Sequence, residues 1–171
     1  MILVSGGTGR VGSRLLEGGE QVRVSCRDGA RARSRFAGRV GIVEGDLRDP
    51  RFATLAVSGA DRVFLLTAQS PTQLEQEQNV IDASRAAGVR QVVKLSVLLA
   101  DEDSPLEIAR VHRRTELELE RSPLAVTILR PGFFMQNVLA MLAGDELRSA
   151  IEDGRSGWST PGTSRPWPPQ R

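Results

Sequence analysis

Short runs of apolar, mostly β-branched residues alternate with longer segments of helical pattern along most of the chain. The runs fall at residues 2–5, 21–25, 40–44, 62–67, 91–96 and 125–130. Their apolar character is largely continuous rather than alternating with polar residues, which is typical of strands covered on both faces. The alternation of strand and helix predicts an α/β fold built on a doubly wound parallel sheet.

Two of the intervening segments carry clear signals for the ends of helices. Ser70 and Ser104 each precede a proline, an arrangement that suits the N-cap and first position of a helix. Gly88 suits the end of the first helix, and the Ser-Pro pair at 122–123 suits the end of the second. We therefore expect one helix with Ser70 as its N-cap and Pro71 as its first residue, and a second with Ser104 and Pro105 in the same places.

The composition changes after Asp153. Residues 154–171 contain four prolines, three glycines, both tryptophans and no aliphatic residue, so they cannot supply a strand or an amphipathic helix. We expect a folded domain over residues 1–153 and a tail over 154–171 that is mostly disordered.

The overall composition excludes some classes of function. The net charge of +2 over 171 residues is too small to indicate nucleic-acid binding. No apolar run approaches the roughly 20 residues that cross a bilayer, so we expect no membrane association. One cysteine and no evident secretory signal favour the cytoplasm, and we expect no metal site.

A glycine triplet follows the first predicted strand. Gly6, Gly9 and Gly12 form a GxxGxxG pattern between that strand and a helix, as in dinucleotide-binding loops. Gly6 permits the tight turn, Gly9 lets a pyrophosphate approach the backbone, and Gly12 lets the helix pack closely on the sheet. The alternative is a glycine-rich turn without a ligand. The cofactor-binding residues predicted for this loop are Gly6, Thr8, Gly9, Arg10, Val11 and Gly12.

The end of the second predicted strand bears on which dinucleotide is bound. An acidic residue at this place would contact the ribose hydroxyls of NAD, whereas an arginine accommodates the additional phosphate of NADP. Arg27 occupies the place here and Asp28 follows it. The sequence therefore favours NADP(H) over NAD(H). Arg31 and Arg33 either add to this phosphate site or are surface residues.

Several segments together resemble the NmrA-like, atypical short-chain dehydrogenase/reductase family. The resemblance covers roughly residues 1–150 and is carried by "GGTGRVG", "VEGDLRDP", "VFLLTA", "VVKLS" and, most specifically, "ILRPGFFMQN". The family includes NADPH-dependent quinone-reductase-like enzymes and redox-sensing regulators. The resemblance implies a six-stranded Rossmann fold with strand order 3-2-1-4-5-6.

The resemblance also implies further cofactor contacts. The implied residues are Asp46 and Leu47 at the adenine, Thr67 and Ala68 along the cofactor channel, Ser96 beside the nicotinamide, and Pro131, Gly132 and Phe133 on its far side. Independently of the family, most of these positions follow predicted strands, and an open α/β sheet binds its ligands at the carboxyl ends of its strands. The alternatives are that "GDLRDP" is only a turn and helix start, and that the phenylalanines belong to the core.

The catalytic apparatus of a standard short-chain dehydrogenase is absent. That apparatus pairs a tyrosine with a lysine, but the sequence contains no tyrosine, and its one lysine, Lys94, lies in a predicted strand. In the corresponding helix, His112 and Glu116 are four residues apart and share one face. Ser96 and His112 are the candidate catalytic residues, with His112 as proton donor. Alternatively, His112 is a surface histidine and the reaction needs no dedicated acid.

Three functions follow from these observations. The first is an NAD(P)H-dependent oxidoreductase that transfers a hydride to a small acceptor of the quinone kind. The second is a redox sensor that binds NAD(P) and signals to a protein partner without turnover. The third is a truncated, inactive remnant, since similar proteins continue past the sixth strand with elements that form the substrate pocket. We expect that substrate-binding C-terminal part to be largely missing.

Overall fold

The computed structural model describes residues 1–15, 21–134, 142–143, 146–147 and 158–159. The chain divides into two units, residues 1–130 and residues 131–171. The first unit contains the alternating strands and helices that the sequence predicts, and it carries the candidate site.

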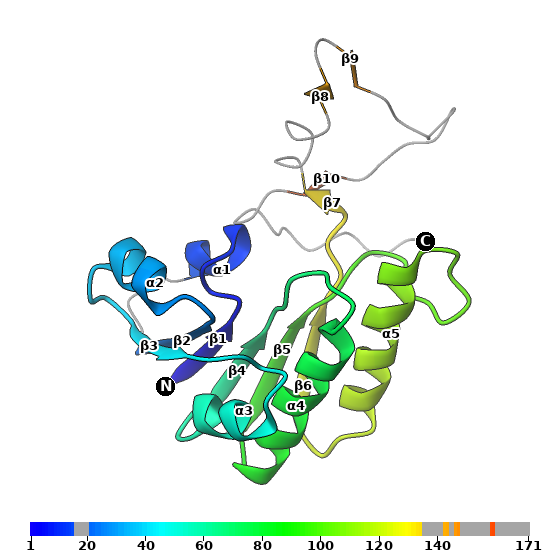
Figure 1. Cartoon of the computed structure of the whole chain (residues 1–171). Helices are drawn as coiled ribbons and strands as arrows, with labels where there is room; N and C mark the ends of the chain where they lie inside the picture. Colours follow the sequence, from blue (N-terminus) through cyan, green and yellow to red (C-terminus); the bar gives the residue numbers. More distant parts are fainter. Residues whose placement is uncertain (16–20, 135–141, 144–145, 148–157, 160–171) are drawn as a thin grey trace. The chain divides into compact units, whose positions relative to one another are not determined.

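The core of the first unit is a parallel sheet (Figure 1). Its six strands are β1 (Ile2–Ser5), β2 (Val22–Cys26), β3 (Gly41–Glu44), β4 (Arg62–Leu65), β5 (Gln91–Leu95) and β6 (Ala125–Leu129). They pair in the order β3-β2-β1-β4-β5-β6, and every pair is parallel. This arrangement confirms the predicted fold class and strand order. The carboxyl ends of all six strands consequently lie at one edge of the sheet.

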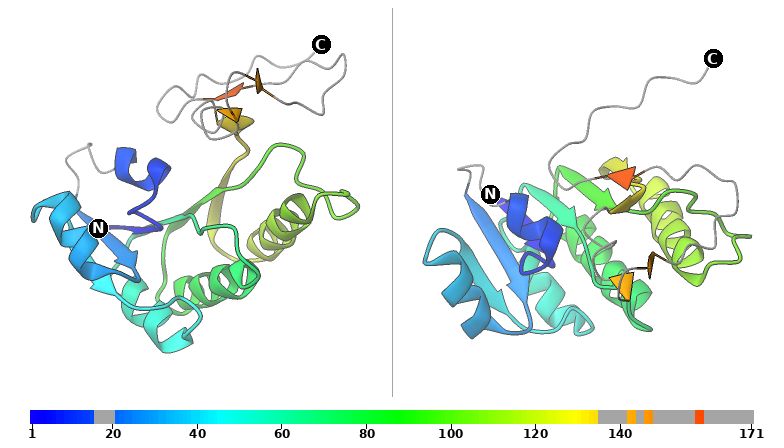
Figure 2. Two further views of the ribbon diagram at one scale, coloured as in Figure 1. Left: turned by 45° about the horizontal axis from the view of Figure 1, so that its top comes forward. Right: turned by 90° about the horizontal axis from the view of Figure 1, so that it is seen from above.

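Five helices connect the strands of the first unit: α1 (Arg10–Leu15), α2 (Gly29–Phe36), α3 (Pro50–Val57), α4 (Gln73–Ala86) and α5 (Glu107–Glu120). Figure 2 shows α3, α4 and α5 side by side along the sheet. The larger apolar cluster joins residues of these three helices to the strands, with Leu3, Val63 and Val92 fully buried. A smaller cluster joins Phe36 of α2 to Val24 of β2. Apolar residues on two sets of helices thus bury much of the inner strands β1, β2, β4 and β5, as their apolar character predicts. The edge strands β3 and β6 contain no buried residue, so the prediction of strands covered on both faces was wrong for these two.

The predicted starts of α4 and α5 were wrong, whereas the predicted ends were correct. Helix α4 begins at Gln73, because the Ser70 carbonyl accepts a hydrogen bond from the Gln73 N–H at 3.0 Å and forms a turn before the helix. Helix α5 begins at Glu107, since the Ser104 hydroxyl accepts from the Leu106 N–H at 3.2 Å instead of capping. Gly88 follows α4 with φ of 68°, as expected for a helix-terminating glycine.

The second unit contains four short strands within its described residues. Strand β7 (Phe133–Phe134) pairs in parallel with β10 (Trp158–Ser159), and β8 (Leu142–Ala143) pairs antiparallel with β9 (Glu146–Leu147). Strand β10 lies within residues 154–171, so the expectation that this segment supplies no strand was wrong. The rest of the predicted tail lies outside the described residues, as does the predicted boundary at residue 153. No helix in the described ranges is long and apolar enough to cross a bilayer.

Candidate functional site

The candidate site lies at the carboxyl edge of the sheet. Gly6, Arg27, Thr67 and Ser96 each follow within two residues of the end of a strand, and Asp46 follows β3 in the same way. Ser5, the last residue of β1, connects this strand to the residue after β4. Its hydroxyl donates to the Leu66 carbonyl at 2.9 Å and accepts from the Leu66 N–H at 2.8 Å. The structure therefore brings these five predicted positions together at one edge.

The glycine loop is closely packed on one side and open on the other. Gly6 has φ of 65°, and a Cβ on it would lie 2.6 Å from the Leu66 carbonyl oxygen. Among the described residues, a Cβ on Gly9 would meet only the Gly6 carbonyl oxygen, at 3.2 Å. The loop therefore leaves space beside the Gly9 backbone, as a bound pyrophosphate requires. Thr8 and Val11 are half-buried, and the side chain of Arg10 lies outside the description.

Two glycines of this loop are needed for reasons that the sequence did not indicate. A Cβ on Gly12 would lie 2.6 Å from Gly7 Cα, so Gly12 packs α1 against the loop itself rather than against a strand. Gly7 was not predicted to matter, yet a Cβ there would lie 2.6 Å from Cγ1 of Val24 in β2. The loop is thus held close to both the first helix and the second strand.

At the end of β2, the charged residues have different roles. Arg27 is exposed, and its side chain has no hydrogen-bond or ion-pair partner among the described residues. Asp28 caps α2, because its carboxylate accepts from the Arg31 N–H at 2.9 Å. Arg33 pairs with Glu44 at 3.6 Å. Arg27 therefore remains available for a ligand, while Asp28 and Arg33 already have partners within the fold.

The segment after β3 forms a turn and starts a helix. The Asp46 carboxylate accepts from Nε and Nη2 of Arg48 at 2.9 and 2.6 Å. The hydrogen bonds from the Arg48 side chain and backbone hold the pKa of Asp46 below its usual value, and the charge of Arg27 adds to this effect. Asn79 Nδ2 of α4 donates to the Leu47 carbonyl at 2.9 Å. The predicted adenine contacts of Asp46 and Leu47 stay predictions.

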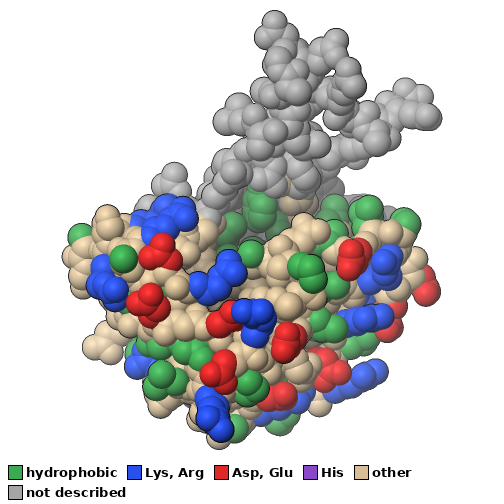
Figure 3. Space-filling view, in the orientation of Figure 1, with side chains coloured by type: hydrophobic (Ala, Val, Ile, Leu, Met, Phe, Trp, Pro, Cys, Tyr) green, Lys and Arg blue, Asp and Glu red, His purple; other side chains and the backbone are tan. Residues whose placement is uncertain are grey.

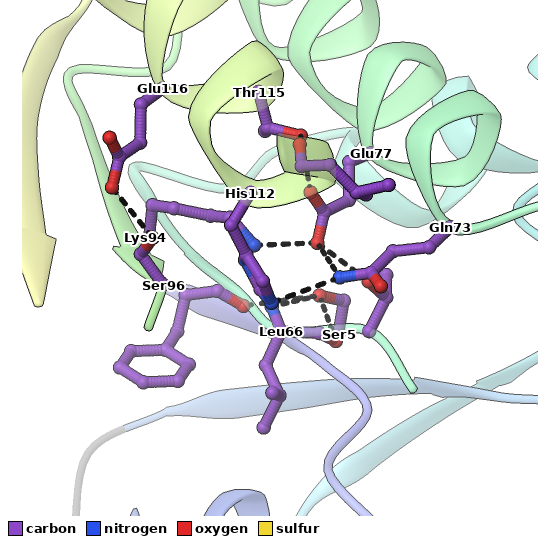
Figure 4. A network of polar contacts seen from close by, with 12 residues as sticks. Ser5, Leu66, Gln73, Glu77, Lys94, Ser96, His112, Thr115 and Glu116 are labelled. Atoms are coloured by element: carbon purple, nitrogen blue, oxygen red, sulfur yellow. Dashed lines mark hydrogen bonds and ion pairs between the residues drawn. The ribbon is translucent and has the colours of Figure 1, made fainter. Parts of the chain in front are cut away.

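A buried polar cluster lies beside the carboxyl ends of β4 and β5 (Figure 4). At its centre, Glu77 of α4 is fully buried and accepts from Lys94 Nζ of β5 at 2.6 Å. Its carboxylate also accepts from the hydroxyls of Thr67 and Thr115, each at 2.6 Å. Burial alone would raise the pKa of Glu77, but Lys94 and the hydrogen bonds hold it below its usual value. The cluster thereby ties Thr67, a predicted cofactor contact, to α4, α5 and β5.

Ser96 and Glu116 belong to a neighbouring group of polar contacts. Ser96 is 2% exposed, and its hydroxyl donates to Glu116 Oε1 at 2.6 Å. Arg130, at the end of β6, donates to the same carboxylate through Nε at 2.8 Å and Nη2 at 2.5 Å. Burial opposes ionisation of Glu116, yet the hydrogen bonds from Arg130, Ser96 and Arg113 lower its pKa. The Ser96 proton is consequently held by a carboxylate within the protein.

His112 is buried, so the expectation of a surface histidine was wrong. It is 6% exposed, its Nε2 lies 3.3 Å from Gln73 Nε2, and its Nδ1 has no partner among the described residues. Burial, followed by the charge of Lys94, lowers the pKa of His112 from 6.5 to about 4. At neutral pH the imidazole is therefore uncharged, which disfavours it as a proton donor. Although His112 and Glu116 are both buried on α5, they contact different partners.

The sequence did not reveal Glu77, Thr115 or the pairing of Lys94. One signal was present: a lysine within the apolar run 91–96 must be paired, because an isolated buried ammonium is very unfavourable. Glu77 also precedes buried Val80 and Ile81 by one helical turn. Helical spacing alone could not identify it as the partner, since the pairing depends on tertiary packing.

The remaining predicted positions are described in part. Ala68 is exposed beside half-buried Thr67. Pro131, Gly132 and Phe133 fall in the second unit, and the Phe133 side chain lies outside the description, so their place near a cofactor stays a prediction. On the described part of the face in Figure 3, acidic and basic side chains intermingle. That part of the surface shows no broad region of one charge.

Comparison with known proteins identifies the relatives of the chain. Residues 6–148 match a family model described as NAD(P)H-binding. The chain is 37% identical over 166 residues to an NAD(P)H azoreductase of Xenophilus azovorans, a match covering 92% of this chain and 58% of that protein. It is 33% identical over 147 residues to quinone oxidoreductase 2 of Escherichia coli strain K12. That match covers 82% of this chain and 51% of the other protein.

A solved structure gives a similar match. The crystal structure of an NADPH-dependent quinone oxidoreductase from Escherichia coli, complexed with NADPH, superposes with a TM-score of 0.75 at 31% identity. The match covers 82% of this chain and 52% of that one. The chain thus spans about half the length of the curated relatives it matches.

Proposed function

Because this chain belongs to the NAD(P)H-binding family, we propose that it binds NADP(H) at the carboxyl edge of its sheet and supports hydride transfer to a small acceptor of the quinone kind. The observation that carries the proposal is the glycine loop, which packs closely on Leu66 at Gly6 and leaves space beside the backbone of Gly9. The activities of the azoreductase and the quinone oxidoreductase, which are similar proteins, support the reaction class.

The residues at this edge fit such a cofactor. The open backbone at Gly9 would receive the pyrophosphate, flanked by Thr8, Arg10 and Val11. Arg27, exposed and without a partner among the described residues, would bind the ribose phosphate that distinguishes NADP from NAD. The other proposed contacts are Asp46 and Leu47 at the adenine, Thr67 and Ala68 along the channel, Ser96 next to them, and Pro131 and Phe133 from the second unit.

The protein's part in the reaction is mainly to bind and orient. Bound NADPH supplies the hydride, so the chain itself needs no redox group. The Ser96 hydroxyl donates to Glu116, and neutral His112 contacts Gln73. These contacts favour positioning roles for Ser96 and His112 over proton donation. We place the protein in the cytoplasm, where its buried free thiol, Cys26, would stay reduced.

Two measurements test the proposal. Fluorescence titration with NADPH and with NADH should show binding of both, with the lower Kd for NADPH. NADPH oxidation should then exceed the buffer rate with at least one member of a quinone panel. Absence of binding to either dinucleotide would overturn the proposal as a whole, and binding without turnover would overturn the enzymatic part.

A second candidate is a sensor that binds NAD(P) without turnover. It is favoured by the absence of tyrosine from the sequence and by the internal contacts of Ser96 and His112. This function requires a protein partner whose affinity depends on the cofactor. Co-purification with and without NADP⁺ should then recover different amounts of one partner, and equal recovery would contradict the idea.

A further inference from the structure

A cleft of about 300 Å³ opens next to the buried polar cluster. The cleft is lined by residues 69–71 of the segment between β4 and α4, by Gln73 at the start of α4, and by Glu107, Ile108 and Val111 of α5. None of these is a predicted cofactor contact, although the segment begins two residues after Thr67. We propose that this cleft binds the acceptor, an uncharged or cationic flat aromatic molecule with an N–H or O–H donor. The acceptor's identity rests on the proposed function, whereas the ligand chemistry rests on the cleft itself.

Gln73 provides the hydrogen-bond acceptor of the cleft. It is 2% exposed, and its Nε2 donates to Glu77 Oε1 at 3.3 Å and faces His112 Nε2 at 3.3 Å. Exchanging the two ends of the amide would place its oxygen beside the Glu77 carboxylate, so the nitrogen must face inward. The carboxamide oxygen has no partner among the described residues, and a ligand donor can therefore bind it.

Three of the seven residues that line the cleft are apolar, and they offer surface on which a ring can pack. Ile108 and Val111 are half-buried on consecutive turns of α5, and Pro71 is exposed on the opposite side. The volume of about 300 Å³ is at the small end of the range for ligand sites. Such a space suits one or two fused rings rather than a peptide or a sugar chain.

The charge at the cleft disfavours anions. Glu107 is exposed among the lining residues, which include no lysine or arginine. Arg110 of the same helix donates to the Ser104 carbonyl at 2.6 Å, so it already has a partner in the fold. An anionic ligand would consequently approach a carboxylate without a lining cation to offset it.

Three probes with one ring system test this chemistry. They are 2-amino-1,4-naphthoquinone, which carries a donor, 1,4-naphthoquinone, which carries none, and 1,4-naphthoquinone-2-sulfonate, which is anionic. We expect affinity to fall in that order when binding to the full chain is measured by calorimetry, without nucleotide and with NADP⁺ so that no turnover occurs. The amino group should improve Kd by roughly 2- to 10-fold. Tightest binding by the sulfonate would overturn the proposal.

Substitutions locate the binding site. Val111→Trp fills the cleft and should raise the Kd of 2-amino-1,4-naphthoquinone at least about tenfold. Arg114→Trp, on the exposed part of the same helix, should leave that Kd unchanged. Equal affinity in both variants would place the site elsewhere. Because Val111→Trp can disturb folding, Glu107→Gln serves as a second variant, and it should improve sulfonate binding by about 2- to 5-fold at low salt. No change in that variant would contradict the role of Glu107.

The design separates this proposal from the proposed function. NADPH titration of Val111→Trp should give the wild-type Kd, so loss of probe binding there identifies the cleft alone. If the wild-type chain failed to bind NADPH, the proposed function would fail while probe binding without nucleotide still tested the cleft.

Discussion

Arg27 is the residue that decides between the two dinucleotides in the proposed function. Its guanidinium is exposed and has no partner among the described residues, so removing it should not disturb the fold. Arg27→Ala should raise the Kd for NADPH about tenfold or more, because hydrogen bonds to charged groups contribute about 1.5–3 kcal/mol. The Kd for NADH should stay the same.

Fluorescence titration with both dinucleotides checks this prediction. Arg90→Ala is the matched control, since Arg90 is exposed, pairs with Asp61 and precedes β5 at the opposite edge of the sheet. The control should bind both dinucleotides as the wild type does. An equal loss of NADPH and NADH affinity in Arg27→Ala would contradict the assigned role.

Glu77 and Lys94 form the most deeply buried ion pair of the described residues, with both side chains 0% exposed. Glu77→Gln should lower the free energy of unfolding by about 3–5 kcal/mol, because it leaves a buried ammonium without its counter-charge. Adding Lys94→Met should recover part of this loss. Urea unfolding of both single variants and the double variant measures the coupling. Additive losses would show that the two charges do not depend on each other.

At the scale of single residues, the sequence predicted those features of the site that depend on neighbours along the chain. The glycine spacing and the place of Arg27 follow from neighbours along the chain, and the structure puts them at the expected edge. The pairing of Lys94 with Glu77 joins residues 17 positions apart on different elements. No propensity or spacing encodes such a contact, because it depends on how α4 packs on the sheet.

The glycines of the loop between β1 and α1 differ in how well they should tolerate substitution by alanine. Gly6→Ala should lower the free energy of unfolding by about 1–3 kcal/mol, since φ is positive and the new Cβ would meet the Leu66 carbonyl. The new Cβ of Gly9→Ala would meet only the Gly6 carbonyl oxygen among the described residues, at 3.2 Å, so this variant should change stability much less. Its Cβ should instead occupy the space proposed for the pyrophosphate.

Two measurements separate these effects. Thermal unfolding should show the larger loss for Gly6→Ala, and NADPH titration of the folded protein should show a large loss for Gly9→Ala. Unchanged NADPH affinity in Gly9→Ala would place the cofactor away from this loop.

At the scale of helices and strands, the first residues of the helices were the feature that the sequence predicted least well. Ser70 and Ser104 have the right identity and spacing for N-caps, but each takes part in a turn before its helix instead. Serine stabilises both arrangements through similar local hydrogen bonds, so the sequence does not distinguish them. Strand positions were predicted more closely, because short apolar runs rich in β-branched residues are a direct signal for strands.

His112 links the pH of the solution to the stability of the whole molecule. Its pKa is about 4 in the folded protein and near 6.5 when it is exposed by unfolding. As pH falls from 6.5 toward 4, the unfolded chain binds a proton that the folded protein does not, so the free energy of unfolding falls. The slope should approach that of one proton, about 1.4 kcal/mol per pH unit.

Urea unfolding at several pH values between 7 and 5 checks this prediction. The lowered pKa values of Glu77 and Glu116 give a slope of the same sign, but only in the acidic range where unfolded carboxylates bind protons. Since His112 is the only histidine in the sequence, His112→Gln should remove the slope between pH 7 and 5. A wild-type stability that does not change over this interval would contradict the assignment.

The burial of that single imidazole has a spectroscopic consequence. A chain with one histidine gives one pair of imidazole carbon-bound proton resonances, free of overlap from other rings of this type. The ring contacts Gln73, which also lines the cleft, so its chemical shifts should respond when an aromatic molecule enters. Isotope labelling of one residue type would thus give a direct signal from the junction of α4, α5 and the cleft, without any change to the chain.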